Sequence, residues 1–405
     1  MTPTIDAARL WQTHMEMARI GATPEGGSNR PALSAVDAEA RALLLRWCEP
    51  LGLSTERDGI GNLFLRRPGS SMRPAVAFGS HLDTVPTGGR FDGVFGVLAG
   101  LEALRVLSGM PLPAPLELVV WTNEEGSRFP PAMTGSRVHA GTLPLDQVMA
   151  VQDDAGVTVA EALVASNQVG LVPPAPRGWA CWIEPHIEQG PVLEAEGAAI
   201  GLVTATVQAR YFHLTIEGEP SHAGPTTMDR RRDSLAAAAE MILAAERAGL
   251  AGEPRGRSSA SWIRNEPNVR GANAHRTRLH LDVRHEDPAE AEAMQHALLG
   301  EVRAIAARRG VRVSVDPYAT FGPVRFDAAL SAVLRDVSAA RQLRVRDMVA
   351  SAGHDSVLLA PLCPSAMLFV PSRGGVTHNP AEYSSPEQLA AGAQVLLDAV
   401  LRLAG

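Results

Sequence analysis

The chain has 405 residues, of which 45% are hydrophobic and 20% charged, and its 37 basic residues against 44 acidic ones give a formal net charge of -7. All 37 basic residues are arginines. The absence of lysine excludes a Schiff-base enzyme, a P-loop phosphate site, a protein kinase and a metal centre bridged by a carbamylated lysine. The abundance of Ala, Gly, Pro and Arg makes codon bias in a GC-rich genome the expected cause.

The length predicts two or three domains with substantial cores. The acidic balance argues against nucleic-acid binding, because no basic stripe is available for phosphates. Three widely spaced cysteines, Cys48, Cys181 and Cys363, indicate reduced thiols. The N-terminus does not resemble a signal peptide, and no run of 18 apolar residues could span a membrane. We therefore expect a soluble cytoplasmic protein.

The first third of the chain has an α/β pattern. Helical spacing of apolar residues predicts helices over 5–20 and 36–52. Strand-like runs follow at 62–65, 75–78 and 116–121. The last two are uniformly apolar and flank a helix-like stretch over 93–107, which predicts buried parallel strands in a strand–helix–strand unit.

The pattern changes from about residue 209. Alternating or helical stretches occur at 211–217, 233–248, 278–283, 288–309 and 311–315. Their order suggests an inserted α+β domain of the ferredoxin-like type. After about residue 326, a helix, a Gly-His-Asp turn and an apolar strand at 366–370 resume the first pattern. We therefore expect a first domain segment over 1–209, an insertion over 210–326 and a second segment over 327–405.

Polar side chains follow the two buried strands, where ligands bind in open α/β sheets. The stretch HLDTVPTGGRFDG contains His81, Asp83 and Asp92, and NEEGS contains Glu124 and Glu125. In an extended His-x-Asp segment both side chains lie on one face, so His81 could bind a metal while Asp83 orients its ring. Adjacent glutamates at the end of a buried strand are costly unless they bind something. Spacing alone does not decide which glutamate binds a metal and which handles a proton.

Two further histidines, His186 in EPHIEQGP and His378 in GGVTHNPAEY, complete a ligand set of nitrogen and oxygen atoms without thiolates. Such a set suits zinc, manganese, cobalt or nickel. Hydrolases often hold two such ions about 3.5–4 Å apart, bridged by one carboxylate.

The motifs HLDTVPTGGRFDG, NEEGSRFP, MTGSR, EPHIEQGPVLE, SHAGPTTMDRRRDS, AGHDS and GGVTHNPAEYS occur in that order. Together they resemble the group of N-carbamoyl-L-amino acid hydrolases, β-ureidopropionases and allantoate amidohydrolases. This group is a branch of the dinuclear metallopeptidases that include aminoacylase and glutamate carboxypeptidase. RIGATPEGG and DGIGNLFLRRPG also fit, so the resemblance covers nearly the whole chain. It implies a metallopeptidase-like catalytic domain, a mixed and mostly parallel sheet flanked by helices, with an inserted ferredoxin-like domain for dimerisation and for closing over the substrate.

The resemblance also implies roles for individual residues. The implied metal ligands, with Asp92 as the bridge, are His81, Asp92, Glu125, His186 and His378. Glu124 carries over as the general base and Asp83 as the partner of His81. Histidine at position 186, where the peptidase relatives have an acidic ligand, favours the amidase branch.

The resemblance further assigns substrate-binding residues. His222 in PSHAGP would stabilise the oxyanion in the partner subunit of a homodimer, and Gln189 would hold the ureido group. Arg284 in LDVRHED would bind the substrate carboxylate in a bidentate fork. The family's usual substrate-binding asparagine precedes an apolar-Pro-Gly turn that this chain lacks, so Asn273 is the expected counterpart and Asn268 a competitor.

We therefore expect a hydrolase with two divalent ions per subunit that cleaves the C–N bond of a small ureido acid. The expected substrate is an N-carbamoyl-L-amino acid, which would yield the amino acid, carbon dioxide and ammonia. Allantoate amidohydrolase and β-ureidopropionase remain alternatives, followed by an aminoacylase or peptidase and by a catalytically silent binding protein. His354 in SAGHDS matches a family turn near the site, where a structural role and a substrate contact are equally plausible.

Overall fold

The computed structural model describes residues 3–405 and divides the chain into two compact units. The first unit comprises Met1–Thr204, Arg325–Met348 and His354–Gly405, and the second comprises Ala205–Val324 and Val349–Gly353. Each unit has its own sheet and its own apolar core. Among residues 3–405, no helix is both long and apolar enough to cross a membrane.

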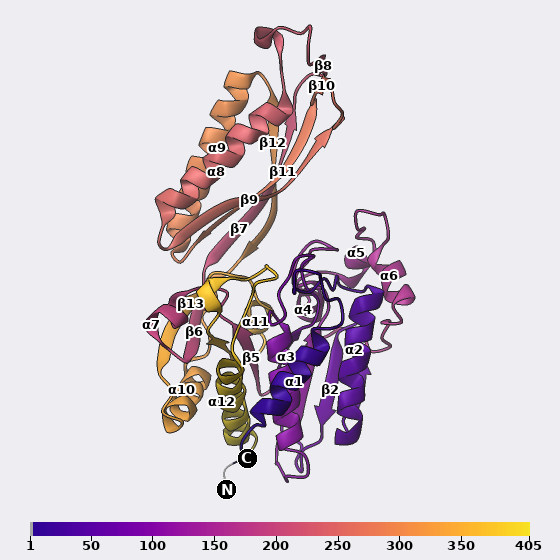
Figure 1. Cartoon of the computed structure of the whole chain (residues 1–405), viewed down its shortest axis with the longest axis vertical. Coiled ribbons are helices and arrows are strands. Elements are labelled where there is room, and N and C mark those ends of the chain that lie inside the picture. Colours follow the sequence, from indigo (N-terminus) through magenta and orange to yellow (C-terminus); the bar gives the residue numbers. More distant parts are fainter. Residues whose placement is uncertain (1–2) are drawn as a thin grey trace. The chain divides into compact units, whose positions relative to one another are not determined.

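An eight-stranded sheet forms the centre of the first unit, apart from the last residues of β6 and β13 (Figure 1). Its strands are β1 (Ser54–Arg57), β2 (Leu63–Arg67), β3 (Val76–His81), β4 (Leu116–Trp121), β5 (Cys181–Ile187), β6 (Ile200–Thr206), β13 (Val345–Ala350) and β14 (Ser365–Val370). Their order is β1-β2-β4-β3-β5-β14-β6-β13. The central strands β4, β3, β5 and β14 are parallel to one another, whereas β2 pairs antiparallel with β4 and β6 pairs antiparallel with β14.

The helices of this unit are α1 (Ala7–Met17), α2 (Ala35–Cys48), α3 (Val94–Val106), α4 (Thr134–His139), α5 (Leu145–Met149), α6 (Val159–Ala165), α7 (Val192–Glu196), α10 (Ala328–Ala340), α11 (Ser356–Leu359) and α12 (Pro386–Ala404). Short 3-10 turns occur at η1 (Glu49–Leu51) and η3 (Arg373–Gly375).

Both faces of the central sheet are buried, which explains why its strands are uniformly apolar. Alternate residues of one strand serve different cores: Val76 and Phe78 of β3 join the large core shared with α1, α2, α3, α10 and α12. Ala77 joins an aromatic core on the other face that contains Trp121 and Trp182. The polar residues that end these strands are therefore fixed by packing on both sides.

The second unit has a four-stranded antiparallel sheet in the order β12-β7-β11-β9. Its elements are β7 (Gln208–Glu217), β8 (Ser221–His222), η2 (Met228–Arg230), α8 (Ser234–Gly252), β9 (Gly256–Glu266), β10 (Ala272–Asn273), β11 (Arg276–His285), α9 (Pro288–Arg309) and β12 (Arg312–Phe321). Helices α8 and α9 lie side by side on one face of the sheet (Figure 1). Alternate residues of β7, among them Phe212, Leu214 and Ile216, pack into the core beneath them.

The expected fold class is confirmed: a mixed, mostly parallel sheet with flanking helices carries an α+β insert with ferredoxin-like strand order. Within the four-stranded sheet of the second unit, β9 is the strand to which the sequence pattern assigned no residue range. Its burial pattern explains the omission, because most of its side chains are exposed or half-buried and lack a regular apolar alternation.

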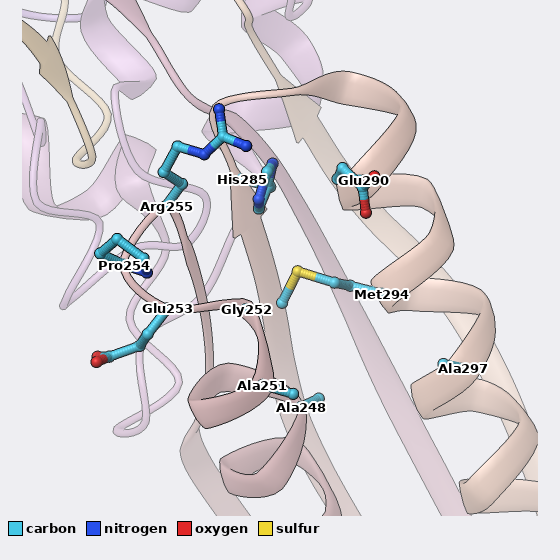
Figure 2. A pocket seen from close by; sticks show the side chains of 10 residues that line it. All are labelled: Ala248, Ala251, Gly252, Glu253, Pro254, Arg255, His285, Glu290, Met294 and Ala297. Carbon is cyan, nitrogen blue, oxygen red and sulfur yellow. The ribbon is translucent and has the colours of Figure 1, made fainter.

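A cavity of about 370 Å³ lies on the helix-covered side of the insert. Figure 2 shows Glu290 and Met294 of α9 across from His285 of β11 and the Glu253–Arg255 turn. Consecutive residues of a strand point to opposite faces. The cavity is therefore on the other side of the sheet from Arg284.

Candidate metal centre

His81 and His186 end the neighbouring parallel strands β3 and β5, and their ring centroids are 6.0 Å apart. Each ring places Nδ1 2.9 Å from a main-chain carbonyl, that of Asp83 for His81 and that of Ile187 for His186. Nδ1 must donate to those carbonyls, so each Nε2 carries a lone pair and no hydrogen. This is the tautomer that a metal-binding histidine needs. The lone pair of His186 Nε2 accepts the N–H of Gly93 at 3.1 Å.

Asp92 lies between the two histidines and His378. Its Oδ1 is 3.1 Å from Nε2 of His186 and 3.9 Å from Nε2 of His81. Its Oδ2 is 3.3 Å from Nε2 of His378 and accepts hydrogen bonds from Gln189 and Thr377. The two oxygens of one carboxylate thus face two separate sets of ligand atoms.

Glu125 and His378 form the second set with Asp92. The Glu125 Oε2 is 3.3 Å from Nε2 of His378. Residues 3–405 therefore contain two groups with ligand atoms close enough to hold an ion, His81–Asp92–His186 and Asp92–Glu125–His378. They contain the five residues expected as ligands, and they share Asp92.

The buried carboxylates of the two ligand groups would be stabilised by cations bound between them. Burial, reinforced by the nearby carboxylates of Asp355 and Glu125, raises the pKa of Glu124 well above its ordinary value. Hydrogen bonds that the His378 ring donates to the carboxylates of Asp92 and Glu125 raise the pKa of His378 to about 11. Crowded, buried carboxylates of this kind are stable only beside positive charge. An all-nitrogen-and-oxygen donor set around a shared carboxylate fits two borderline divalent ions.

Glu124 and Asp83 lie beside this set. Oε2 of Glu124 is 3.5 Å from Nε2 of His81, so its carboxylate borders the first group and belongs to neither. The Asp83 carboxylate accepts the main-chain N–H groups of Glu124 and Glu125, both at 3.2 Å. It lies 3.9 Å from Nδ1 of His81, whose partner is the carbonyl of Asp83 itself.

Glu382 supports the Asp92 loop, and sequence reasoning did not single it out. Its Oε1 accepts the N–H groups of Phe91 and Asp92, and its Oε2 accepts the Thr377 hydroxyl. Burial raises the pKa of Glu382 to about 7. The available signal was an acidic residue in NPAEYSS, four positions after the candidate ligand His378.

Two candidate substrate contacts also lie in the first unit. Gln189 has a left-handed backbone (φ 60°) and donates from Nε2 to Asp92 at 2.8 Å, while its buried Oε1 has no hydrogen-bond partner among the described residues. The His354 ring packs edge-on against His186, with centroids 4.5 Å apart. His354 is buried, so it borders the centre from behind the His186 ring.

The other candidate substrate residues belong to the second unit. Asn273 of β10 pairs with Ser221 of β8 and donates to its hydroxyl, so it is adjacent to His222. Arg284 lies on β11 opposite Ala209 at the start of β7, whereas β8 follows the far end of β7. Within this unit the structure therefore brings His222 and Asn273 together and places Arg284 at the opposite end of the sheet. Asn268 is exposed in the turn before β10.

Comparison with known proteins extends over nearly the whole chain. The family model described as peptidase family M20/M25/M40 matches residues 77–402. An N-carbamoyl-L-amino-acid amidohydrolase of Rhizobium meliloti is 38% identical, with 99% of this chain and 97% of the relative covered. An allantoate amidohydrolase of Bacillus subtilis is 35% identical, with 96% and 95% covered. The crystal structure of an amidase of the hydantoinase/carbamoylase family from Burkholderia vietnamiensis is 41% identical, covers 99% of this chain and 98% of that one, and has a TM-score of 0.97.

Proposed function

Because the chain belongs to peptidase family M20/M25/M40, and within it to the hydantoinase/carbamoylase group of amidohydrolases, we propose that it hydrolyses N-carbamoyl-L-amino acids. The observation that carries this proposal is the pair of ligand groups sharing Asp92, with Glu124 beside them. The products are the L-amino acid, carbon dioxide and ammonia.

His81, Asp92 and His186 would hold one divalent ion, and Asp92, Glu125 and His378 the other. The ions themselves supply Lewis-acid catalysis and lower the pKa of the attacking water. Zinc, manganese, cobalt and nickel all suit these ligands.

Glu124 is the general base in this proposal. Its raised pKa suits a carboxylate that takes a proton from water and returns it to the leaving nitrogen. It is not needed as a ligand, because each group already has three donors without it. Asp83 keeps the glutamate turn in place through two main-chain hydrogen bonds.

Polar groups in each of the two units match the chemistry of a ureido acid. The unpartnered Oε1 of Gln189 can accept an N–H of the ureido group. Arg284 presents a guanidinium, held by Asp282 and the carbonyl of Ser351, that can bind a carboxylate. His222 accepts the N–H of Gly224 on Nδ1, so the neutral ring carries its proton on Nε2 and can donate it to an oxyanion. Asn273, adjacent to His222, is the proposed further contact.

We propose that the enzyme is a homodimer and that His222 serves the partner subunit's site. The placement of His222 and Arg284 within the inserted unit supports this, because Arg284 pairs with the start of β7 whereas His222 lies on β8, which follows the other end of β7 in a separate two-stranded sheet. The insert also exposes apolar side chains that a second copy could cover: Leu235, Leu243 and Leu250 on α8, and Trp262 and Ile263 on β9. The insert would then provide both the dimer contact and the closure over the substrate.

Allantoate hydrolysis is the second candidate. Allantoate also combines ureido groups with a carboxylate, and the relative from Bacillus subtilis is an allantoate amidohydrolase with 35% identity. N-carbamoyl-β-alanine, the substrate of β-ureidopropionase, has the same two groups with one more methylene between them.

A turnover screen of the metal-loaded protein tests the proposal. The substrates are N-carbamoyl-α-amino acids, N-carbamoyl-β-alanine, allantoate and N-acetyl amino acids. We expect N-carbamoyl-L-amino acids to be hydrolysed fastest, with activity lost on chelation and regained when metal is added. Faster hydrolysis of allantoate would select the second candidate, and faster hydrolysis of N-acetyl substrates would overturn the choice of branch. A protein that binds metal and turns over none of them would be a silent binding protein.

A further inference from the structure

The carboxylate of Asp83 has two hydrogen-bond partners, and both belong to the glutamate turn. Oδ1 accepts the N–H of Glu124 and Oδ2 accepts the N–H of Glu125, each at 3.2 Å. The side chain is buried, with 1% of the residue exposed. A buried carboxylate without these donors would be strongly disfavoured, so the turn and the carboxylate hold each other.

His81 does not depend on this carboxylate for its orientation. The Nδ1 of His81 is 2.9 Å from the main-chain carbonyl of Asp83 but 3.9 Å from its Oδ1, beyond hydrogen-bond distance. The carbonyl already determines which ring nitrogen carries the proton. Replacing the side chain at position 83 leaves this carbonyl in place.

The turn is shaped to present consecutive N–H groups to an anion. Asn123 and Gly126, on either side of the two glutamates, both have left-handed backbones (φ 56° and 63°). Such residues let successive N–H groups converge on one carboxylate. The Asn123 side chain donates to the carbonyl of Phe129 and the hydroxyl of Thr134, which fixes the turn from its other side.

The main chain on the far side of the turn is also tied. The N–H of Met133 donates to the carbonyl of Glu124 at 2.6 Å, and that of Thr134 to the carbonyl of Asn123 at 3.2 Å. The Asp83 carboxylate therefore supplies the remaining restraint, on the N–H side of both glutamates.

The hydrogen bonds between Asp83 and the glutamate turn affect the two ligand groups differently. Glu125 belongs to the group with Asp92 and His378, whereas no glutamate belongs to the group with His81. We propose that Asp83 is a positioning residue for the Glu124–Glu125 turn, and that it supports the ion of the Glu125 group and the base rather than the His81 ligand. This inference rests on the proposed dinuclear centre and specifies how one of its ions is selectively stabilised.

The test measures zinc affinity at one group at a time, by competition with a chromophoric chelator. His378→Ala leaves the His81 group able to bind an ion, and His81→Ala leaves the Glu125 group. Asp83→Asn is then added to each. We expect it to weaken zinc binding about 10–100-fold in the His81→Ala background. In the His378→Ala background we expect the zinc affinity to stay within about threefold, because the carbonyl of residue 83 still orients His81.

If Asp83→Asn weakened zinc binding only in the His378→Ala background, the carboxylate would act through His81. That result would overturn the proposal. Equal weakening in both backgrounds, or in neither, would overturn it as well. If neither histidine variant binds zinc while Asp83 is intact, the dinuclear centre itself fails, which is a distinct result. Glu102→Gln is the matched control, because Glu102 is also buried and also accepts a main-chain N–H, that of Asp6, outside the turn.

A second variant keeps the test decisive if Asp83→Asn does not fold. Alanine at position 123 resists the left-handed backbone and lacks the two side-chain hydrogen bonds, whereas glycine lacks only the bonds. In the His81→Ala background, we expect Asn123→Ala to weaken zinc binding more than Asn123→Gly does. In the His378→Ala background, we expect neither substitution to change the zinc affinity. Unchanged affinity in Asn123→Ala would contradict the positioning role of the turn.

Discussion

Asp92 is the residue around which the centre is organised, since its two oxygens face different histidines and both candidate ion groups include it. A carboxylate in that position could offer one ligand oxygen to each of two cations. Its own placement comes from Glu382, which accepts the N–H groups of Phe91 and Asp92. In the proposed centre, the lysine-free chain would use an aspartate where other binuclear hydrolases use a carbamylated lysine.

Mutation should distinguish the proposed roles of the two adjacent glutamates, Glu124 as the base and Glu125 as a metal ligand. Glutamine at position 124 cannot take a proton, but it keeps the shape of the side chain. We expect Glu124→Gln to bind two metal ions per subunit and to lose about 10²–10⁴-fold in kcat. Metal content by elemental analysis and kcat are measured on the same preparation. Glu125→Gln is the comparison and should lose metal affinity; near-normal turnover in Glu124→Gln would reject it as the base.

Gly93 should tolerate no side chain. Its backbone is left-handed (φ +66°), and a Cβ there would lie 2.3 Å from Cε1 and Nε2 of His81. We expect Gly93→Ala to displace the His81 ring and reduce the bound metal from two ions to one, measured by elemental analysis. Gly300→Ala, where a Cβ meets nothing within 4 Å, should keep both ions. Two tightly bound ions in Gly93→Ala would show that the His81 ring can move without loss.

At the scale of elements, buried arginines hold the strand ends that carry the site. Arg30 donates to the carbonyls of Leu82 and Ile20, and its pKa is lowered to about 10 by burial. Arg41 donates to the carbonyls of Gly61 and Trp121, just before the glutamate turn. A guanidinium offers several donors in a fixed plane, so one arginine can tie two loops together in a way that an ammonium group cannot.

Helix α1 carries a buried histidine that should make the fold acid-sensitive. His14 packs between Phe91 and Phe95, with centroids 5.7 and 6.2 Å away, and both its ring nitrogens lack partners among the described residues. Burial lowers the pKa of His14 to about 3. As the pH falls below about 6.5, His14 becomes protonated in the unfolded chain but stays neutral in the folded chain. The free energy of unfolding therefore decreases as the pH falls toward 3.

We therefore expect His14→Phe to gain about 2 kcal/mol relative to wild type between pH 8 and pH 5. The measurement is the urea midpoint of tryptophan fluorescence, with chelator present so that metal release does not contribute. His296→Gln, on the exposed side of α9, is the control and should follow wild type at both pH values. If the difference in the free energy of unfolding between His14→Phe and wild type did not change with pH, His14 would take up a proton as readily in the folded chain as in the unfolded chain. That result would contradict the prediction.

The sequence was most informative where packing is periodic and least where main-chain geometry decides. Apolar runs located β3 and β4, and the polar residues after them could be recognised as a site. The carbonyl that orients His81 and the N–H groups that hold Asp83 could not be predicted, because every residue type carries them. Glu382 was missed for a similar reason, since its partners are the N–H groups of Phe91 and Asp92.

At the scale of the whole molecule, the insert of the proposed homodimer would determine how many chains one active site needs. Arg284 pairs with the start of β7 in the four-stranded sheet, whereas His222 lies on β8, in a separate two-stranded sheet that follows the other end of β7. Both residues are proposed to contact the substrate. If each site takes Arg284 from its own chain and His222 from the partner subunit, two differently inactivated chains should complement each other.

Mixing chains that carry Glu124→Gln with chains that carry His222→Ala tests this arrangement. Each homodimer is inactive, but in a mixed dimer the His222→Ala chain keeps Glu124 and receives His222 from its partner. Random reassortment in equal amounts makes half the dimers mixed, each with one working site of two, so kcat should recover to about a quarter of wild type. Should His222 serve its own chain, no mixture would exceed the sum of the two parents, because no site would then hold both residues. Refolding the two variants separately before mixing is the control, since without subunit exchange no activity should appear.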